Sequence, residues 1–310
     1  MIELDLLDLP TEIPTPVGEM PERLYHYTDI HGLMGILESN SLWASAAYYL
    51  NDSSEIEYGC SLLLKELPHW VELNKGSKRF AARILAILYG VFSHPHSKLS
   101  RSSNIYVACF CEGDNLLSQW RAYSQKGGYA LGFRARMDLS MKPAGPYNLS
   151  LGKVVYSEPW QFRRIRAVLR EAILAVDAEF RDRPITDFDS NLVSDTVLML
   201  QELLLDEIVR FKHPAFVDER EWRLVARFDP RRPLPKTKPS DQPLFRFRSS
   251  GGYLVPYIEL KPAKGKLPLC SVRVGPSLDF KRYDGPTRLF LARHGFSDAE
   301  VVGSDLPVIL

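Results

Sequence analysis

Two long amphipathic segments in the middle of the chain constrain its fold more than any other feature. Within residues 161–181, apolar side chains recur every three or four positions, at Ile165, Val168, Leu169, Ala172, Ile173, Val176 and Phe180. Residues 190–211 repeat this pattern with Leu192, Val193, Val197, Leu200, Leu204, Ile208 and Phe211. The spacing is typical of helices that bury one face, and Pro184 separates the segments while Pro214 ends the second. We therefore expect a helical hairpin over residues 161–211.

Strand-like segments lie on both sides of this hairpin. They are Asn104–Phe110, Gly128–Phe133, Trp222–Phe228, Tyr253–Leu260 and Leu269–Val274. Shorter helices are expected at 30–39, where Asp29 is an N-cap and Asn40 a stop, and at 54–67, 77–92, 116–123 and 285–295. Regular strand–helix alternation and the glycine fingerprint of a dinucleotide-binding sheet are missing. The sequence predicts an α+β fold with a mixed, mainly antiparallel sheet.

The chain reads as one α+β domain over 23–310, with 161–211 inserted, after an extended acidic leader over 1–22. Its net charge is +1, but residues 1–60 carry eleven acids and one base, whereas residues 229–288 carry thirteen bases and five acids. Two interpretations stay open: solvated faces that attract each other, or a basic surface for a phosphate-bearing partner such as DNA or RNA. Residues 229–252 are expected to form a long loop.

The four cysteines fit no standard disulfide framework, and Cys109 and Cys111 lack a second pair to complete a zinc site. Reduced thiols favour a cytoplasmic protein. The first residues are acidic, without the basic and apolar regions of a signal peptide. The longest apolar run, Ala81–Phe92, is too short to span a bilayer, so we expect no metal site and no membrane contact.

Groups able to bind or react gather at the ends of several apolar segments. His26 and Thr28 share one face of a strand and can bond a ligand, or His26 is a hydrogen-bonded strand end. Asn51 and Asp52 precede Glu55 either as a helix start or as groups that face His26. The segment Gln119–Tyr123 presents Trp120, Arg121 and Tyr123, which either stack a ring or belong to the core.

The block that most strongly suggests a functional site is Glu219-x-Glu221-Trp222-Arg223. At strand spacing Glu219, Glu221 and Arg223 share one face while Trp222 turns into the core. The block is either a row of ion pairs or a site where Glu221 steadies developing positive charge and Arg223 binds phosphate or orients the acid.

Several blocks resemble a bacterial family of unknown function over about residues 23–307. They are His26-Tyr27-Thr28, Asn51-Asp52-x-x-Glu55, Cys109-Phe110-x-Glu112, Gln119-Trp120-x-x-Tyr123, Glu221-Trp222-Arg223 and Val274-Gly275-Pro276.

A looser resemblance connects the chain to ADP-ribosyltransferases. His26-Tyr27-Thr28 before a helix, followed by Leu42-Trp43-Ala44, is similar to the opening of that superfamily. The resemblance implies a split sheet, NAD as cofactor, and transfer of ADP-ribose in a toxin or phage-defence role. It places His26 on the NAD ribose and makes Glu221 the catalytic acid, with Glu219 as the outer acid of the pair. The expected cofactor site is then His26, Tyr27, Thr28, Asn51, Asp52, Trp120, Arg121, Tyr123 and Arg223.

Two other classes of function stay open. One is a metal-dependent nuclease, with Mg²⁺ held by Asp52, Glu55, Glu219 and Glu221 near Lys212. The other is a non-catalytic module that binds a nucleotide at the same residues. In either case the apolar stripes of 161–211 offer a surface for a homodimer.

Overall fold

The computed structural model describes residues 19–49, 54–75, 80–93, 105–123, 127–143, 145–179, 190–228, 245–250 and 252–307. Contacts divide the chain into two compact units. We call residues 1–17, 47–105 and 155–216 the helical unit, and residues 18–46, 106–154 and 217–310 the sheet unit. Each unit is described by itself.

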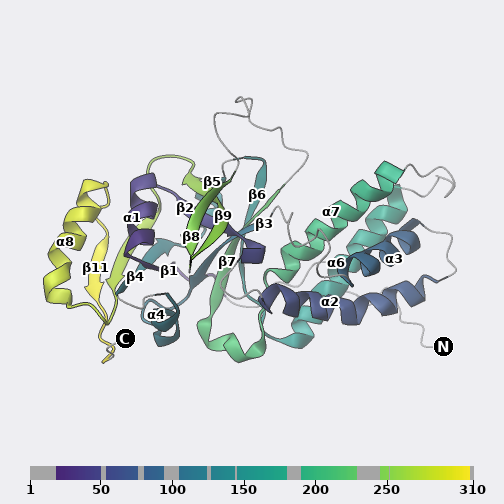
Figure 1. Ribbon diagram of the computed structural model, residues 1–310, viewed down its shortest axis with the longest axis horizontal. Coiled ribbons are helices and arrows are strands. Elements are labelled where there is room, and N and C mark those ends of the chain that lie inside the picture. The colour runs from purple at the N-terminus through teal and green to yellow at the C-terminus, as the bar shows by residue number, and fades with distance from the viewer. Residues whose placement is uncertain are drawn as a thin grey trace. The chain divides into compact units, whose positions relative to one another are not determined.

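Long helices that pack on one another build the helical unit (Figure 1). They are α2 (Ser54–Leu73), α3 (Phe80–Phe92), α6 (Glu158–Glu179) and α7 (Ser190–Ile208). The predicted hairpin is confirmed as α6 and α7, and both helices pack with α2 and α3. A buried ion pair joins α6 to α7. Arg164 donates to both carboxylate oxygens of Glu207, at 2.6 and 2.8 Å.

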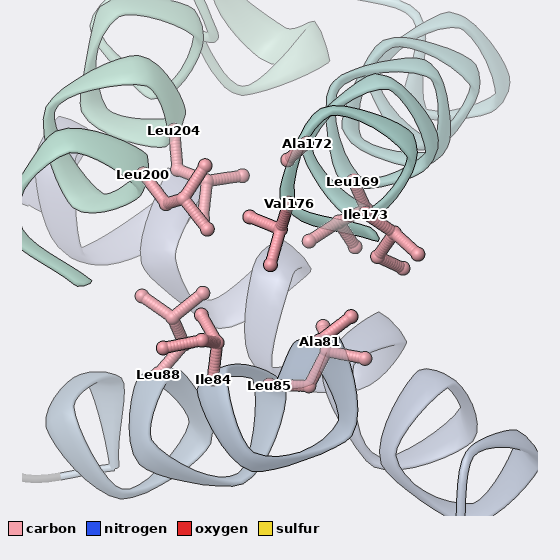
Figure 2. A pocket seen from close by; sticks show the side chains of 10 residues that line it. All are labelled: Ala81, Ile84, Leu85, Leu88, Leu169, Ala172, Ile173, Val176, Leu200 and Leu204. Atoms are coloured by element: carbon pink, nitrogen blue, oxygen red, sulfur yellow. The ribbon is translucent and has the colours of Figure 1, made fainter. Parts of the chain in front are cut away.

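A small cavity lies among three of these helices. Figure 2 shows side chains of α3, α6 and α7 pointing toward it from three sides, and all ten lining residues are apolar. Its volume is about 10 Å³, at the lower limit of what one water molecule needs. We interpret it as a packing defect of the helical core, because an apolar space of this size gives a ligand neither room nor polar partners.

In the described residues, eleven strands form one open sheet in the sheet unit. They are β1 (Arg23–Asp29), β2 (Leu42–Ala46), β3 (Ile105–Cys111), β4 (Gly128–Arg134), β5 (Met141–Pro143), β6 (Tyr147–Lys153), β7 (Glu221–Phe228), β8 (Arg246–Ser250), β9 (Tyr253–Pro262), β10 (Leu269–Val274) and β11 (Glu300–Gly303). The main order is β11-β10-β4-β1-β3-β2-β9-β5, while β7 joins β3 to β6 and β8 pairs with β9. β10 pairs with β11 in parallel, whereas β1–β3, β1–β4, β4–β10, β2–β3, β2–β9, β5–β9, β6–β7 and β8–β9 are antiparallel pairs. The prediction of a mixed, mainly antiparallel sheet is confirmed.

Two helices cover opposite faces of β1. Helix α1 (Ile30–Ser39) buries Leu33, Ile36 and Leu37 in the main core, beside Leu24 of β1. Helix α4 (Leu117–Tyr123) buries Trp120 against Tyr27, on the other face. The predicted limits of α1 are confirmed, because the Asp29 carboxylate accepts a 2.8 Å hydrogen bond from Gly32 N and Asn40 ends the helix with φ 48°. The remaining helices of this unit are α5 (Met137–Ser140) and α8 (Phe280–Arg293), and α8 lies along β11 (Figure 1).

The sheet opens between β1 and β3. These two strands share one recorded register pair, Tyr25 with Cys111, whereas β1 and β4 pair along their whole length. The His26 side chain enters this opening and bonds the backbone carbonyl of Cys109, with a Nδ1–O distance of 2.9 Å. A side chain therefore takes the place that ladder hydrogen bonds would occupy.

Two expectations about local structure were wrong. The stretch 229–252 was expected to be a loop, but its end contains strand β8; the rest of that stretch lies almost entirely outside the described residues. Glu219 was placed on a strand with Glu221, but it ends the 3₁₀ helix Pro214–Glu219, and Arg220 follows with φ 45° before β7 begins. This turn breaks the two-residue alternation that put Glu219 on the face of Glu221.

Across the described ranges, no helix is both long enough and apolar enough to cross a membrane.

A matched pair of glycine substitutions tests the packing of α1. A Cβ on Gly35 would lie 2.4 Å from the indole of Trp43, which is rigid and stacked on Tyr257, so we expect Gly35→Ala to destabilise the protein by about 1–3 kcal/mol. Gly90 in α3 has nothing within 4 Å of such a Cβ, and Gly90→Ala should stabilise by about 0.5–1 kcal/mol through helix propensity. Urea unfolding measures both, and equal effects would contradict the packing of α1 on Trp43.

Candidate functional site

Tyr27 and Trp120, both expected to bind a cofactor, form a buried structural cluster instead of an open surface. Their rings meet edge to face at 4.8 Å, and Trp120 is 0% exposed. The Tyr27 hydroxyl donates to the Gly113 carbonyl at 2.9 Å and accepts from Leu116 N at 2.8 Å. Burial raises the pKa of Tyr27 well above its usual value, so the hydroxyl keeps the proton it donates. The cluster ties β1 to the turn that starts α4.

The Val274-Gly275-Pro276 block completes this cluster. Gly275 N donates to the Gly128 carbonyl at 2.8 Å. A Cβ on Gly275 would come within 2.9 Å of that carbonyl oxygen and 3.0 Å of the Trp120 ring. Glycine at this position therefore allows the backbone after β10 to lie directly against the Trp120 indole.

Two further blocks meet at Glu112. Its carboxylate accepts hydrogen bonds from Trp222 Nε1 at 2.9 Å and from Lys153 Nζ at 2.7 Å. Burial alone would raise the pKa of Glu112, but these two donors outweigh burial and lower it. The blocks Cys-Phe-x-Glu and Glu-Trp-Arg are thus joined by a hydrogen bond that holds the end of β3 to β7.

Glu221 and Arg223 form a buried ion pair on one face of β7, as the strand spacing predicted for these two residues. Arg223 donates through Nε and Nη2 to the two carboxylate oxygens of Glu221 at 2.7 and 3.0 Å, and the residues are 1% and 4% exposed. Trp222 points into the main core, which also confirms its predicted direction.

The structure does not bring Glu221 to His26. His26 lies two residues after Leu24 and packs at 5.7 Å from Phe110, so it points to the face of the sheet that holds Leu24, Phe110 and Trp222. Glu221 adjoins Trp222 in β7 and therefore points to the opposite face. The pairing of these two residues across one cofactor, which the transferase resemblance implies, stays a prediction.

Of the residues expected to bind Mg²⁺, Glu55 belongs to the helical unit, and Glu219 and Glu221 belong to the sheet unit. Glu55 forms a 2.9 Å ion pair with Lys212 inside the helical unit, and Asn51 and Asp52 lie outside the described residues. Within the part of the chain that is described, no three His, Cys, Asp or Glu side chains are placed to hold a metal ion. The nuclease hypothesis stays a prediction.

His26 is held in one chemical form. The Cys109 carbonyl can only accept, so Nδ1 carries the proton and Nε2 is left as an acceptor. Burial lowers the pKa of His26, the Cys109 carbonyl raises it, and the nearby Arg248 charge lowers it further; the net result is a lowered pKa. A neutral imidazole whose Nε2 accepts a hydrogen bond suits a hydroxyl donor on a ligand.

Arg248 is a functional candidate that sequence reasoning missed. It extends from β8 and donates to the Ser45 hydroxyl through Nε at 3.3 Å and Nη2 at 3.0 Å. Burial lowers its pKa, and the nearby Asp29, Tyr123 and Tyr257 act in the opposite direction. We call His26, Asp29, Ser45, Tyr123, Arg248 and Tyr257 the Arg248 cluster.

The Arg248 cluster contains buried, half-buried and exposed side chains. Ser45 and Tyr257 are buried, His26 and Arg248 are half-buried, and Asp29 and Tyr123 are exposed. Its members come from β1, β2, α4, β8 and β9. Of the predicted site residues, it keeps His26 and Tyr123, while Thr28 lies against the first turn of α1 at Gly32 and Arg121 is exposed on α4. The sequence signal for Arg248 was the alternation Phe245-Arg246-Phe247-Arg248.

Part of this chain matches a known protein family. Residues 119–224, about a third of the chain, match a family described as protein of unknown function (DUF2971). The match contains the Gln119-Trp120 and Glu221-Trp222-Arg223 blocks and lies C-terminal to His26. The predicted resemblance to a family of unknown function is confirmed over this narrower range. No curated protein and no solved structure matches the chain.

The Glu112 hydrogen bonds predict a pH-dependent stability. Because its pKa is lowered in the folded protein, Glu112 stabilises the fold at pH values above its ordinary pKa of 4.5, and this contribution disappears as the pH falls through the lowered value. We expect Glu112→Gln to be less stable than the wild type at pH 7, with the difference shrinking below about pH 4.5. Urea unfolding from pH 7 to pH 3 measures this difference, and a constant gap would contradict the assignment.

We expect substitution of Glu221 to lower the stability of the folded protein. Glu221→Gln leaves the buried Arg223 beside an uncharged partner, and breaking a buried pair costs about 3 kcal/mol or more. The exposed Asp218→Asn removes one charge three residues earlier and should change the free energy of unfolding by less than about 0.5 kcal/mol. A Glu221→Gln protein as stable as Asp218→Asn would show that the ion pair has no structural role.

Proposed function

We propose that the sheet unit binds a phosphate-bearing nucleotide at the Arg248 cluster, with NAD as the first candidate. One observation carries this proposal. Arg248 is a half-buried cation whose hydrogen bonds, among the described residues, go to the hydroxyl of Ser45 and to no carboxylate. Buried charges in proteins are ordinarily paired, so this guanidinium has donor capacity left for an anion.

A phosphate group is the anion that this arrangement suits. A guanidinium presents donors in a planar fork and forms strong paired hydrogen bonds with phosphate oxygens. Ser45 engages Nε and Nη2, which leaves the Nη1 donors of Arg248 for a ligand. A neutral His26 near Arg248 can accept a hydrogen bond from a hydroxyl, which matches a ribose next to a phosphate.

Aromatic groups beside the cluster support a nucleotide over a free anion. Tyr257 stacks on Trp43 at 4.8 Å, with 28° between the rings. Trp43 Nε1 is buried and has no hydrogen-bond partner in the described structure. A buried donor without a partner is the kind of group that a bound ligand or water satisfies.

Binding is favoured over transfer of ADP-ribose. Stabilising an oxocarbenium-like transition state needs a carboxylate beside the reacting ribose. Glu221 points away from the face of His26 and is engaged by Arg223, and Glu219 lies in a 3₁₀ helix. The non-catalytic nucleotide-binding module is therefore the interpretation that the arrangement supports best, and no nicotinamide release is expected.

Nucleotide binding tests the proposal directly. We expect NAD to bind the wild type, measured by ligand-observed NMR and by calorimetry. Arg248→Met should weaken binding by about 10- to 100-fold, the value of losing charge-assisted hydrogen bonds. The matched control is Arg293→Met, which removes the same charge from an exposed position of α8, the helix that packs on β11 at the opposite end of the strand order from β9. His26→Ala should also weaken binding.

Competition with smaller ligands shows which part of NAD the site binds. ADP and AMP should compete with NAD if Arg248 binds phosphate, whereas nicotinamide alone should not. Failure of NAD, ADP and AMP to bind at millimolar concentration would overturn the proposal, as would equal effects of Arg293→Met and Arg248→Met. Nicotinamide release that is lost in a folded Glu221→Gln protein would restore the transferase hypothesis.

A further inference from the structure

The hairpin of β8 and β9 leaves one apolar face uncovered. Phe247 of β8 and Leu254 of β9 are 57% and 71% exposed, and Phe245, which immediately precedes β8, is 43% exposed. Phe247 is opposite Pro256 in the register, on the face that also holds Leu254. Further along β9, the same face holds Ile258, which is 0% exposed in the main core. The uncovered face is therefore a continuation of the face that forms the core.

The opposite face of the hairpin is basic. Arg246 is opposite Tyr257 in the register, so it lies on the face that also holds Glu259 and Lys261. Arg246 and Lys261 both reach the Glu259 carboxylate, at 3.5 and 3.3 Å, and their side chains are still 57% and 56% exposed. Arg248 lies on this face as well, two residues after Arg246. Three cations share the face with one carboxylate, so it carries a net positive charge.

One edge of β8 has no neighbouring strand in the described part of the chain. β8 pairs with residues 253–257 of β9 along its whole length, and no other described strand pairs with it. A free edge presents backbone N–H and C=O groups that an added strand can satisfy. Opposite residues of neighbouring strands point to the same face. A strand that matches this edge therefore alternates apolar side chains, for the apolar face, with acidic side chains, for the basic face.

The first residues of this chain have that alternation. In the run Ile2-Glu3-Leu4-Asp5-Leu6, three apolar side chains share one face at strand spacing and two acidic side chains share the other. Residues 1–22 contain six acids and no Lys or Arg. Residues 245–248 read Phe-Arg-Phe-Arg, which is the same alternation with the opposite charge. The two segments are thus complementary in both apolar pattern and charge.

We propose that residues 2–6 of a second copy of this chain add to the free edge of β8 as a strand. Their apolar side chains cover Phe245 and Phe247, and their carboxylates lie beside Arg246, which are favourable cross-strand pairs. Each copy has one such segment and one such edge, so exchange between two copies closes into a symmetric pair with both edges covered.

Direct pairing of one β8 edge with another is a poorer match. Whenever the apolar faces of two β8 strands lie on the same side, the arginines of both strands share the other side. Like charges opposite each other destabilise a sheet. An acidic strand removes this repulsion, which favours residues 2–6 over a second β8 as the occupant.

This inference is independent of nucleotide binding at the Arg248 cluster. It concerns the association of two chains, and substitutions in residues 2–6 leave every residue of the cluster in place. Either proposal can therefore fail while the other stands.

Sedimentation velocity of the full chain, from about 1 to 100 µM, tests the association. We expect the wild type to show a reversible monomer–dimer equilibrium. Leu4→Glu/Leu6→Glu and Phe247→Glu should each weaken it at least tenfold, because burying one such apolar side chain is worth roughly a factor of ten. The matched control is Leu289→Glu, at a position of α8 that is 75% exposed, and it should associate like the wild type. Thermal unfolding of every variant confirms that it is folded.

A mixture of the two defective variants separates strand exchange from other forms of association. Leu4→Glu/Leu6→Glu keeps an intact β8 edge, whereas Phe247→Glu keeps intact residues 2–6. Each should stay monomeric alone, and the mixture should form a heterodimer held by one intact contact. Two fluorescent labels, one on each variant, distinguish this heterodimer from either variant paired with itself.

A peptide of residues 1–9 tests for backbone pairing. It should bind the full-length Leu4→Glu/Leu6→Glu variant, measured by fluorescence anisotropy. Two further peptides are N-methylated at alternate positions, one at residues 3 and 5 and the other at residues 4 and 6. An added strand donates from one set of N–H groups to its neighbour, so one N-methylated peptide should lose binding while the other keeps it.

Three results would overturn the proposal. One is a wild type that stays monomeric at about 100 µM, because the edge would then be covered within one chain or by a different protein. Another is a dimer that Phe247→Glu abolishes and Leu4→Glu/Leu6→Glu leaves intact, because the apolar faces would then pack on each other. The third is equal binding of both N-methylated peptides, which would exclude pairing through the edge.

Discussion

The hydroxyl of Tyr27 is the group on which the arrangement of the sheet unit depends. It donates to Gly113 and accepts from Leu116, which fixes the turn after β3 against β1. Trp120 packs on the Tyr27 ring and donates to Asn115 Oδ1 at 2.9 Å. These contacts hold β1 to the start of α4. The residue before Tyr27, His26, is thereby held at the opening between β1 and β3.

Buried polar groups set the roles of the remaining blocks. Glu112 is satisfied by Trp222 and Lys153, and Glu221 by Arg223. Buried charges of this kind are costly unless paired, and paired carboxylates have little capacity left for a substrate. Arg248 differs because its hydrogen bonds in the described structure go to the neutral Ser45, while the Asp29 carboxylate is nearby without accepting one. The contrast between satisfied carboxylates and an incompletely satisfied guanidinium is the physical basis of our proposal that this cluster binds an anion.

Part of the candidate site was readable from the sequence. His26 was selected as a strand residue at the start of a helix, and it does lie where the sheet opens. Tyr27 and Trp120 were selected because aromatic side chains near polar ones can bind rings, but the same properties serve a buried aromatic pair whose polar ends are hydrogen-bonded. Residue type alone does not separate these outcomes, because the difference lies in which neighbours supply the partners. Arg248 could not be predicted as a site residue, because the residues that define its surroundings, Ser45 and His26, lie about two hundred residues away in sequence.

The sequence by itself determined the local elements, since helical periodicity, capping residues and strand alternation act over a few residues. It predicted α1 with both its caps, the helices of the 161–211 hairpin, and the direction of Trp222. Only the tertiary structure decided which elements meet: that α6 and α7 pack with α2 and α3, that His26 and Glu221 occupy opposite faces of the sheet, and that β8 brings a guanidinium to β1 and β2. The face of a strand follows from its register with neighbours, and register is settled by contacts between segments far apart in the chain.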